Sequence, residues 1–248
     1  MLRLWPNAPQ APQQYLIDHP QELKKTLAAM QDTGVGIFDL EIIRINESFN
    51  AHTWDALYEI GAKLSAKAIL VAGDDSDEYR LTDNYAKLCE VIQPYGMTAD
   101  LEFMPWTAVA NAASALRIVK NAGSPPSAGI LIDALHFGRS QTTLEDIRSI
   151  PPTLLHYSQI CDAQAGTHFT HEEMIHTARC ARELPGNGTI DLQGLVSHRV
   201  LQIIQLALRL TSTMPTATRA KAASSVGVTA SPKIRVPNSK ANNGVKKT

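Results

Sequence analysis

Short apolar segments with the composition of β-strands recur along the first two thirds of the chain. They lie about 30 residues apart, and the stretches between them place apolar residues every three or four positions, as amphipathic helices do. Regular alternation of strand and helix is typical of parallel strands joined by right-handed crossovers. The predicted strand segments are residues 2–5, 35–45, 66–75, 98–106, 127–137 and 154–163.

Two of the helical stretches have recognisable ends. Pro20 suits the first turn of a helix that Gly34 would close, and Asp83 is a predicted N-cap of a helix that Gly96 would close. No strand is followed by the glycine-rich phosphate loop of dinucleotide-binding or P-loop proteins. The predicted fold is therefore an α/β barrel of repeated strand–helix units, a (β/α)8 TIM barrel.

Composition agrees with one barrel domain. The chain has 248 residues, of which 44% are hydrophobic, which is enough for a single core of this kind. It contains no run of 18 uncharged apolar residues and no signal-peptide pattern after Met1, so we expect a cytoplasmic protein that does not enter membranes. The three cysteines are widely spaced without a CxxC pair, and we expect them to be reduced and mostly buried.

Charge divides the chain into two parts. Residues 1–191 contain all 24 Asp and Glu and 14 of the 23 Lys and Arg, a net of −10, whereas residues 192–248 have a net of +9. The tail from about Ser212 lacks aromatic residues and is predicted to be disordered. We therefore divide the chain into a barrel, residues 1–195, and a non-barrel part, residues 196–248. The negative barrel argues against binding to a phosphate backbone, and we expect no specific nucleic acid partner.

Polar side chains lie at or near the ends of several predicted strands. The carboxyl ends of barrel strands meet at one mouth, where carboxylates would repel one another unless a cation lies among them. The pattern therefore predicts a divalent metal site. For Glu41 taken alone, a salt bridge or a loop cap is an equally good interpretation. The residues are Glu41, Glu102, Asp133, His136 and Gln159.

Two other segments resemble metal sites less well. His171 and His176 are five residues apart rather than the four that place two zinc ligands on one helical face, so a solvated loop and helix start is the better interpretation. Residues 73–80 resemble half of a calcium loop but lack its glycine and its final glutamate. We predict a strand-end loop and helix cap there, with contact between substrate and Asp74 or Asp75 left open.

Several motifs, taken in order, resemble the sugar phosphate isomerase/epimerase family, which comprises xylose isomerase-like TIM barrels. The resemblance covers residues 1–195, and its most specific parts are the LEF, DALH and QICDA motifs followed by the Pro-Gly-x-Gly loop. The matching segments are LEIIRI (40–45), ILVAGDD (69–75), ADLEFMPW (99–106), GILIDALHF (129–137), YSQICDA (157–163) and RELPGNGTIDLQGL (182–195).

The resemblance implies roles for individual residues. Glu102, Asp133 and Gln159 resemble the metal ligands on the fifth, sixth and seventh strands of the family barrel. His136 resembles the histidine that reaches the substrate oxygen, and Arg182 lies in the loop that helps to close the mouth. The implied cofactor is Mn²⁺, Mg²⁺ or Co²⁺.

The resemblance also implies a reaction on a small sugar, sugar phosphate or hydroxy-carbonyl compound. The metal would polarise the carbonyl, Glu102 would remove a proton from the neighbouring carbon, and the ion and His136 would hold the enediolate. Isomerisation, epimerisation and dehydration all remain open at this point. Glu41, His136 and Arg182 are the predicted substrate contacts.

The pattern of the family is followed only from its second to its seventh strand. No Asp or Glu follows Asp191, so the glutamate expected on the eighth strand has no counterpart. We interpret the abrupt change near residue 196 as a shifted reading frame or an error in the assignment of the gene. With three of four ligands, we expect weakened metal binding and activity. One alternative is a noncatalytic barrel remnant whose open strand edges pair with another subunit. The other is a metal-dependent endonuclease, which the negative charge of the barrel disfavours. A homo-oligomer is also compatible with the sequence.

Overall fold

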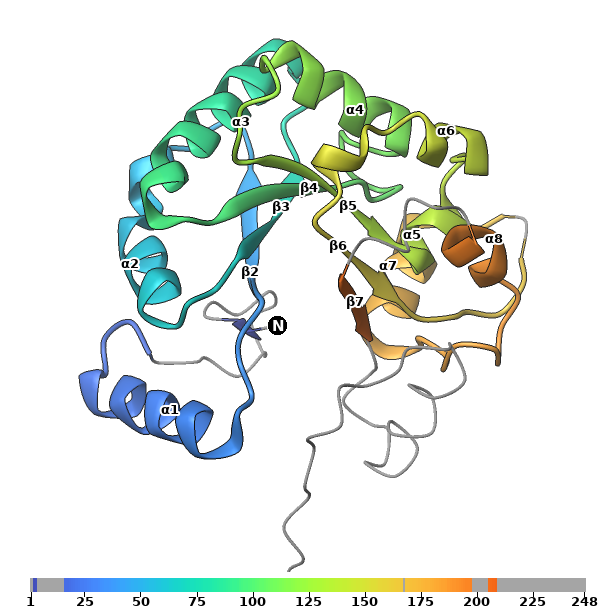
Figure 1. Cartoon of the computed structure of the whole chain (residues 1–248). Coiled ribbons are helices and arrows are strands. Elements are labelled where there is room, and N and C mark those ends of the chain that lie inside the picture. Colours follow the sequence, from blue (N-terminus) through green and yellow to red (C-terminus); the bar gives the residue numbers. More distant parts are fainter. Residues whose placement is uncertain (1, 4–15, 167, 198–204, 209–248) are drawn as a thin grey trace, which may run out of the picture.

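The computed structural model describes residues 2–3, 16–166, 168–197 and 205–208 of the chain. Its centre is a seven-stranded sheet in which each strand pairs in parallel with the next strand along the chain (Figure 1). The strands are β1 (Leu2–Arg3), β2 (Asp39–Ile45), β3 (Ala68–Gly73), β4 (Thr98–Glu102), β5 (Ala128–Asp133), β6 (Tyr157–Ile160) and β7 (Gln205–Leu208).

The helices surround the curved sheet on its outer side, as Figure 1 shows for α2, α3, α4 and α6. Consecutive parallel strands joined through outer helices are the arrangement of a TIM barrel. The α-helices are α1 (Pro20–Thr33), α2 (Asp55–Lys63), α3 (Glu78–Ile92), α4 (Ala112–Asn121), α5 (Ala134–Arg139), α6 (Leu144–Arg148), α7 (His171–Cys180) and α8 (Leu192–Ser197). Short 3-10 helices are η1 (Ala51–Trp54), η2 (Gln93–Tyr95) and η3 (Pro152–Leu154).

The predicted strand–helix order is confirmed, with two differences. Each of the six predicted strand segments contains one of the strands β1 to β6, but β7 was not predicted, because a short apolar run does not distinguish a strand from a helix. The predicted N-cap Asp83 is wrong. Helix α3 begins six residues earlier than predicted, where the side chain of Asp77 accepts hydrogen bonds from the backbone N–H groups of Tyr79 and Arg80. Helix α1 ends as predicted, with Gly34 in the left-handed conformation.

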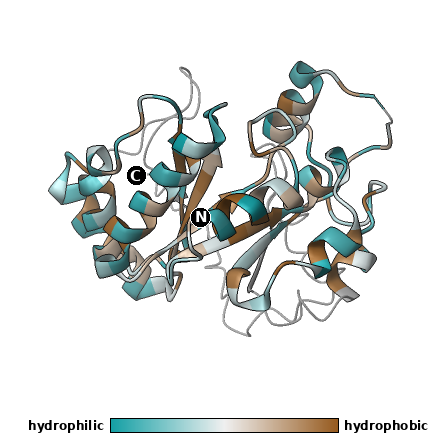
Figure 2. Cartoon of the chain, turned by 90° about the horizontal axis from the view of Figure 1, so that it is seen from above, coloured by the Kyte–Doolittle hydropathy of each residue, from teal (hydrophilic) through white to brown (hydrophobic). Residues whose placement is uncertain are grey.

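Two apolar layers lie on the two faces of the sheet. Side chains alternate along β3, so that Ile69 and Val71 pack toward the helices while Leu70 and Ala72 point to the interior of the barrel. Figure 2 shows apolar residues concentrated in the strands and hydrophilic residues on the outer faces of the helices. This alternation is what gives the sheet an inner face on which polar side chains can be buried.

Cys89 and Cys161 are buried and free, and Cys180 is free and exposed. No helix in the described ranges is long and apolar enough to cross a membrane. The predicted domain boundary between residues 195 and 196 falls within α8, and the predicted disordered tail lies outside the described residues.

Candidate metal centre

Three side chains reach the mouth of the barrel, two from the ends of neighbouring strands and one from the helix that follows. Glu102 is the last residue of β4 and Asp133 the last residue of β5, and these strands pair in parallel, so both end on the same side. Asp133 also begins α5 by accepting a hydrogen bond from the backbone N–H of Leu135 at 2.8 Å. This cap starts the helix immediately after the strand and places His136 in its first turn, above the mouth.

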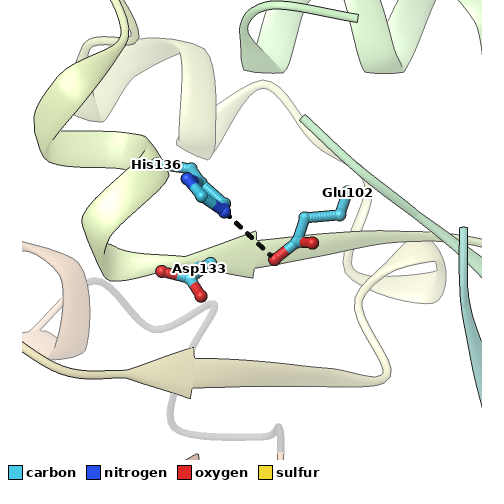
Figure 3. Close-up of side chains that lie close together, drawn as sticks. All are labelled: Glu102, Asp133 and His136. Carbon is cyan, nitrogen blue, oxygen red and sulfur yellow. Dashed lines mark ion pairs between the residues drawn. The ribbon is translucent and has the colours of Figure 1, made fainter. Parts of the chain in front are cut away.

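The three side chains form a compact buried cluster (Figure 3). One potential ligand atom from each of Glu102, Asp133 and His136 lies within 4.8 Å of the other two. His136 Nε2 is 3.6 Å from Glu102 Oε1, and no residue of the three is more than 2% exposed. Two ionised carboxylates this close together in a buried site repel each other, unless positive charge compensates them or one takes up a proton.

The donor set fits a divalent metal ion. Carboxylate oxygens and an imidazole nitrogen are ligands of Zn²⁺ and Mn²⁺, and carboxylates are ligands of Mg²⁺. Two atoms bound to one ion at about 2.1 Å can be at most about 4.2 Å apart. Shifts of the ligand atoms by a few tenths of an ångström, through small side-chain rotations, therefore suffice to bring the cluster to that spacing. We therefore regard Glu102, Asp133 and His136 as a candidate metal centre.

A buried arginine already balances part of this charge. Arg182 Nη1 donates to both oxygens of Asp133, at 2.9 and 2.8 Å, and lies 2.9 Å from the sulfur of Cys161. Burial lowers the pKa of the Arg182 guanidinium, but the charge of Asp133, its hydrogen bonds to Arg182 and the nearby Cys161 and Glu102 together outweigh this effect, and the pKa lies above its usual value. Burial also raises the pKa of the Cys161 thiol to about 11, so this group is protonated at neutral pH.

The loop that carries Arg182 is fixed by Asp162. The backbones of Asp162 and Glu183 exchange two hydrogen bonds, and the Asp162 carboxylate accepts from the backbone N–H groups of Gly186 and Ile190. Gly186 adopts a φ of +91°, which favours glycine. The Pro-Gly-x-Gly loop is thus held against the segment that follows β6, and it places Arg182 at the mouth.

Gln159 and Glu41 meet across the interior of the barrel. Gln159 is the register partner of Asp133, so both point inward, and Gln159 Nε2 donates a long hydrogen bond of 3.4 Å to Glu41 Oε1. Glu41 belongs to β2, which is four strands away from β6 in the sheet. The contact shows that the sheet curves enough to bring the side chains of distant strands together.

A small cavity of about 50 Å³ lies at this mouth. Four of the predicted site residues line it: Glu41, Glu102, His136 and Arg182. Asp133 reaches the same place through its ion pair with Arg182. The structure therefore gathers five of the six predicted site residues around one cavity, and connects the sixth, Gln159, to it through Glu41.

The comparisons with known proteins identify the family and the fold of the chain. A family model described as a xylose isomerase-like TIM barrel matches residues 16–198. The chain belongs to this family. The resemblance and the fold predicted from the sequence are confirmed. No curated protein sequence matches the chain.

Solved structures share the same barrel at low sequence identity, so their likeness shows the fold alone. The IolI protein with a bound zinc atom is 18% identical, with a TM-score of 0.69 over 86% of this chain and 82% of that one. The probable 3-DHS dehydratase AsbF from Bacillus anthracis is 14% identical (TM-score 0.67; 86% and 83% covered). The 3-keto-D-glucoside 4-epimerase YcjR from E. coli is 15% identical (TM-score 0.64; 84% of both chains).

The mouth of this xylose isomerase-like barrel contains three further residues that the sequence did not single out. The ring of Trp106 packs edge-on against His136, with centroids 4.9 Å apart, and limits how that ring can turn. Its position four residues beyond Glu102, just past the same strand end, is the signal that could have found it. Arg44 and Arg179 also line the cavity.

Arg44 is brought to the mouth by an irregularity in β2. The register between β2 and β3 shifts between Leu40 and Ile43, so that both Glu41 and Arg44 face the cavity although they are three residues apart. Arg44 Nη1 pairs with Asp74 Oδ2 at 2.7 Å, which brings Asp74 to the edge of the site.

The two weaker metal patterns have structural explanations. Arg80 pairs with Asp75 at 2.6 Å and lowers the pKa of that carboxyl, so this loop fixes the start of α3. His171 and His176 are exposed on α7, whose first turn is capped by Thr170. Neither histidine joins a metal-ligand cluster with other described residues.

Proposed function

We propose that the chain is a divalent-metal-dependent isomerase or epimerase acting on a small sugar, sugar phosphate or hydroxy-carbonyl compound. The observation that carries the proposal is the buried cluster of Glu102, Asp133 and His136 beside a cavity at the carboxyl ends of the strands. Active sites of TIM barrels lie at this end. The neighbours in fold include an epimerase and a probable dehydratase, which supports this reaction class.

Glu102 and Asp133 would hold the metal ion, with Gln159 as the further ligand that the family resemblance implies. The approach of His136 Nε2 to Glu102 makes its imidazole a second candidate for this role. When bound, the ion would polarise the substrate carbonyl and make the neighbouring C–H group more acidic.

The protein's own groups divide the proton transfer. Glu102 is the base that removes the proton from the carbon next to the carbonyl, and in an isomerisation the protonated Glu102 returns it to the neighbouring carbon of the enediolate. Its burial excludes water that would otherwise weaken its interactions. His136 donates a hydrogen bond to the oxygen on which negative charge develops, and Trp106 holds its ring in place. Glu41 and Arg182 bind the polar groups of the remainder of the substrate.

A metal-dependent activity screen tests this function. Protein treated with a chelator is assayed with added Mn²⁺, Mg²⁺, Co²⁺ or Zn²⁺ against ketoses, hydroxypyruvate and inososes. We expect activity that requires the metal and that falls by about 10²–10⁴-fold in Glu102→Gln, the usual contribution of a general base. The matched control is Glu90→Gln, since Glu90 is exposed on α3, and it should retain full activity.

Metal binding measured by calorimetry separates this function from that of a noncatalytic barrel remnant. An enzyme of the proposed class binds a divalent ion at micromolar concentration, and the remnant does not. Absence of both metal binding and turnover would reject the proposed function.

A further inference from the structure

Arg182 and a metal ion have the same partner, Asp133. We propose that Arg182 competes with the divalent cation for Asp133 and thereby sets the affinity of the site. This inference rests on the proposed metal-dependent function and adds a role for a residue of this chain that the function alone does not require.

The contacts of Asp133 are the first support. Both of its oxygens accept hydrogen bonds from Arg182 Nη1, and one of them also accepts from the backbone N–H of Leu135. Asp133 has little freedom to turn, because the cap of α5 fixes its side chain. A cation that binds Asp133 must therefore approach a carboxylate on which a guanidinium already lies.

Burial makes this competition strong. Asp133 is 0% exposed and Arg182 is 4% exposed, so water screens neither charge. Two positive groups next to one carboxylate repel each other far more in such an environment than at a solvated surface. Occupation of Asp133 by a dication therefore favours departure of the guanidinium, and the guanidinium in place weakens binding of the dication.

The size of the cavity is a second, independent observation. The cavity that Arg182 helps to line is about 50 Å³, whereas small-molecule sites typically measure roughly 300–1,000 Å³. Movement of the guanidinium away from Asp133 would enlarge this space. The same movement would free the arginine to contact polar groups of a substrate.

The surrounding structure limits the movement to the side chain. The backbone beyond Arg182 is anchored through Glu183, Gly186 and Ile190 to Asp162. Arg182 Nε donates to the carbonyl of Ala178 at 2.8 Å, so a rotation would break this bond, the pair with Asp133 and the contact with the sulfur of Cys161. The loop itself can stay in place.

The decisive experiment compares Mn²⁺ affinity by calorimetry in the wild type, Arg182→Gln and Arg182→Lys. We expect Arg182→Gln to bind Mn²⁺ at least tenfold more tightly than the wild type, because it removes the competing charge. Arg182→Lys keeps a positive charge and should stay within threefold of the wild type. Equal or weaker binding by Arg182→Gln would overturn the proposal.

Arg179→Gln is the matched control. Arg179 lines the same cavity but is exposed on α7, so its loss changes the net charge equally without freeing Asp133. We expect its Mn²⁺ affinity to change less than threefold. A change as large as that of Arg182→Gln would mean that general electrostatics, not competition at Asp133, controls the affinity.

A second measurement does not depend on the folding of a variant. In crystals of the wild type grown with Mn²⁺, Arg182 should no longer lie within hydrogen-bond distance of Asp133. Persistence of the ion pair beside a bound ion would contradict competition while leaving the metal-dependent function intact. Failure of every protein to bind Mn²⁺ would instead reject the proposed function and, with it, this inference.

Discussion

Two successive layers on the inner face of the barrel contain the same residue types but differ in their roles. In the mouth layer, Glu102 lies 3.6 Å from His136 next to a cavity. In the lower layer, two residues earlier on the same strand, Asp100 lies 2.7 Å from His156. Both carboxylates are buried, and the upper one lines the cavity of about 50 Å³ at the mouth.

The lower layer satisfies its charges within the protein. Asp100 accepts a hydrogen bond from Thr98 Oγ1 at 2.6 Å on one oxygen and is paired with His156 on the other. Gly129 on the adjacent strand leaves the room for this pair, since a Cβ at that position would collide with both Asp100 and His156. Both oxygens of Asp100 therefore have a partner within the protein.

The mouth layer differs from the lower layer in the spacing of its carboxylate–histidine pair. Asp133 has Arg182, whereas Glu102 is paired to a histidine at a distance longer than a hydrogen bond. Carboxylate–histidine pairs occur in both layers. Geometry rather than residue type therefore distinguishes the functional pair from the structural pair. Substitutions in the lower layer should alter stability, and those in the mouth layer should alter binding and catalysis.

The largest stability effect is expected for Asp100→Ala. The substitution leaves Thr98 and His156 without their buried partner and creates a small void. We expect the free energy of unfolding to fall by about 2–4 kcal/mol, less than for a fully buried pair because the His156 side chain is 26% exposed. Urea unfolding measures this, and the exposed Asp83→Ala should change the same quantity by less than about 0.5 kcal/mol. Equal effects of the two variants would remove the distinction between the layers.

Glu102→Gln should have a smaller and opposite effect. Replacing this carboxylate with an amide removes a buried negative charge close to Asp133, so we expect the metal-free protein to be as stable as the wild type or about 1 kcal/mol more stable. Added Mn²⁺ should then raise the melting temperature of the wild type more than that of the variant. Loss of stability comparable to that of Asp100→Ala would place Glu102 among the structural residues.

Much of the fold could be predicted because its signals are local. Apolar runs at regular intervals predicted β1 to β6, and Gly34 marked the end of α1. The start of α3 was misplaced because Asp77 and Asp83 are equally good N-caps in sequence, and packing decides between them. β7 was missed because its apolar segment has no periodicity that distinguishes strand from helix.

The site was predictable to the extent that strand ends define it. Glu102 and Asp133 each end a strand of a parallel sheet, so their approach follows from the fold class. The Arg182–Asp133 pair could not be predicted, because it joins residues 49 positions apart through a loop whose path depends on Asp162. Contacts across the interior, such as that of Gln159, depend on the curvature of the sheet, which no local pattern specifies.

The smallest expected effect is a pH dependence of the lower layer. The hydrogen bond with Asp100 raises the pKa of His156 above its usual value of 6.5, although burial opposes this. A group whose pKa is higher in the folded than in the unfolded protein stabilises the fold fully below the unfolded pKa, and this contribution is lost as the pH rises through the folded value. The difference in unfolding free energy between the wild type and His156→Gln should therefore be largest near pH 6, and it should shrink by about 1 kcal/mol at higher pH.

Urea unfolding over a range of pH measures this difference, with the exposed His176→Gln as the control that should follow the wild type at every pH. A difference that stays constant with pH would show that His156 acts through packing, and the contrast between the layers would then rest on Asp100 and Gly129 alone.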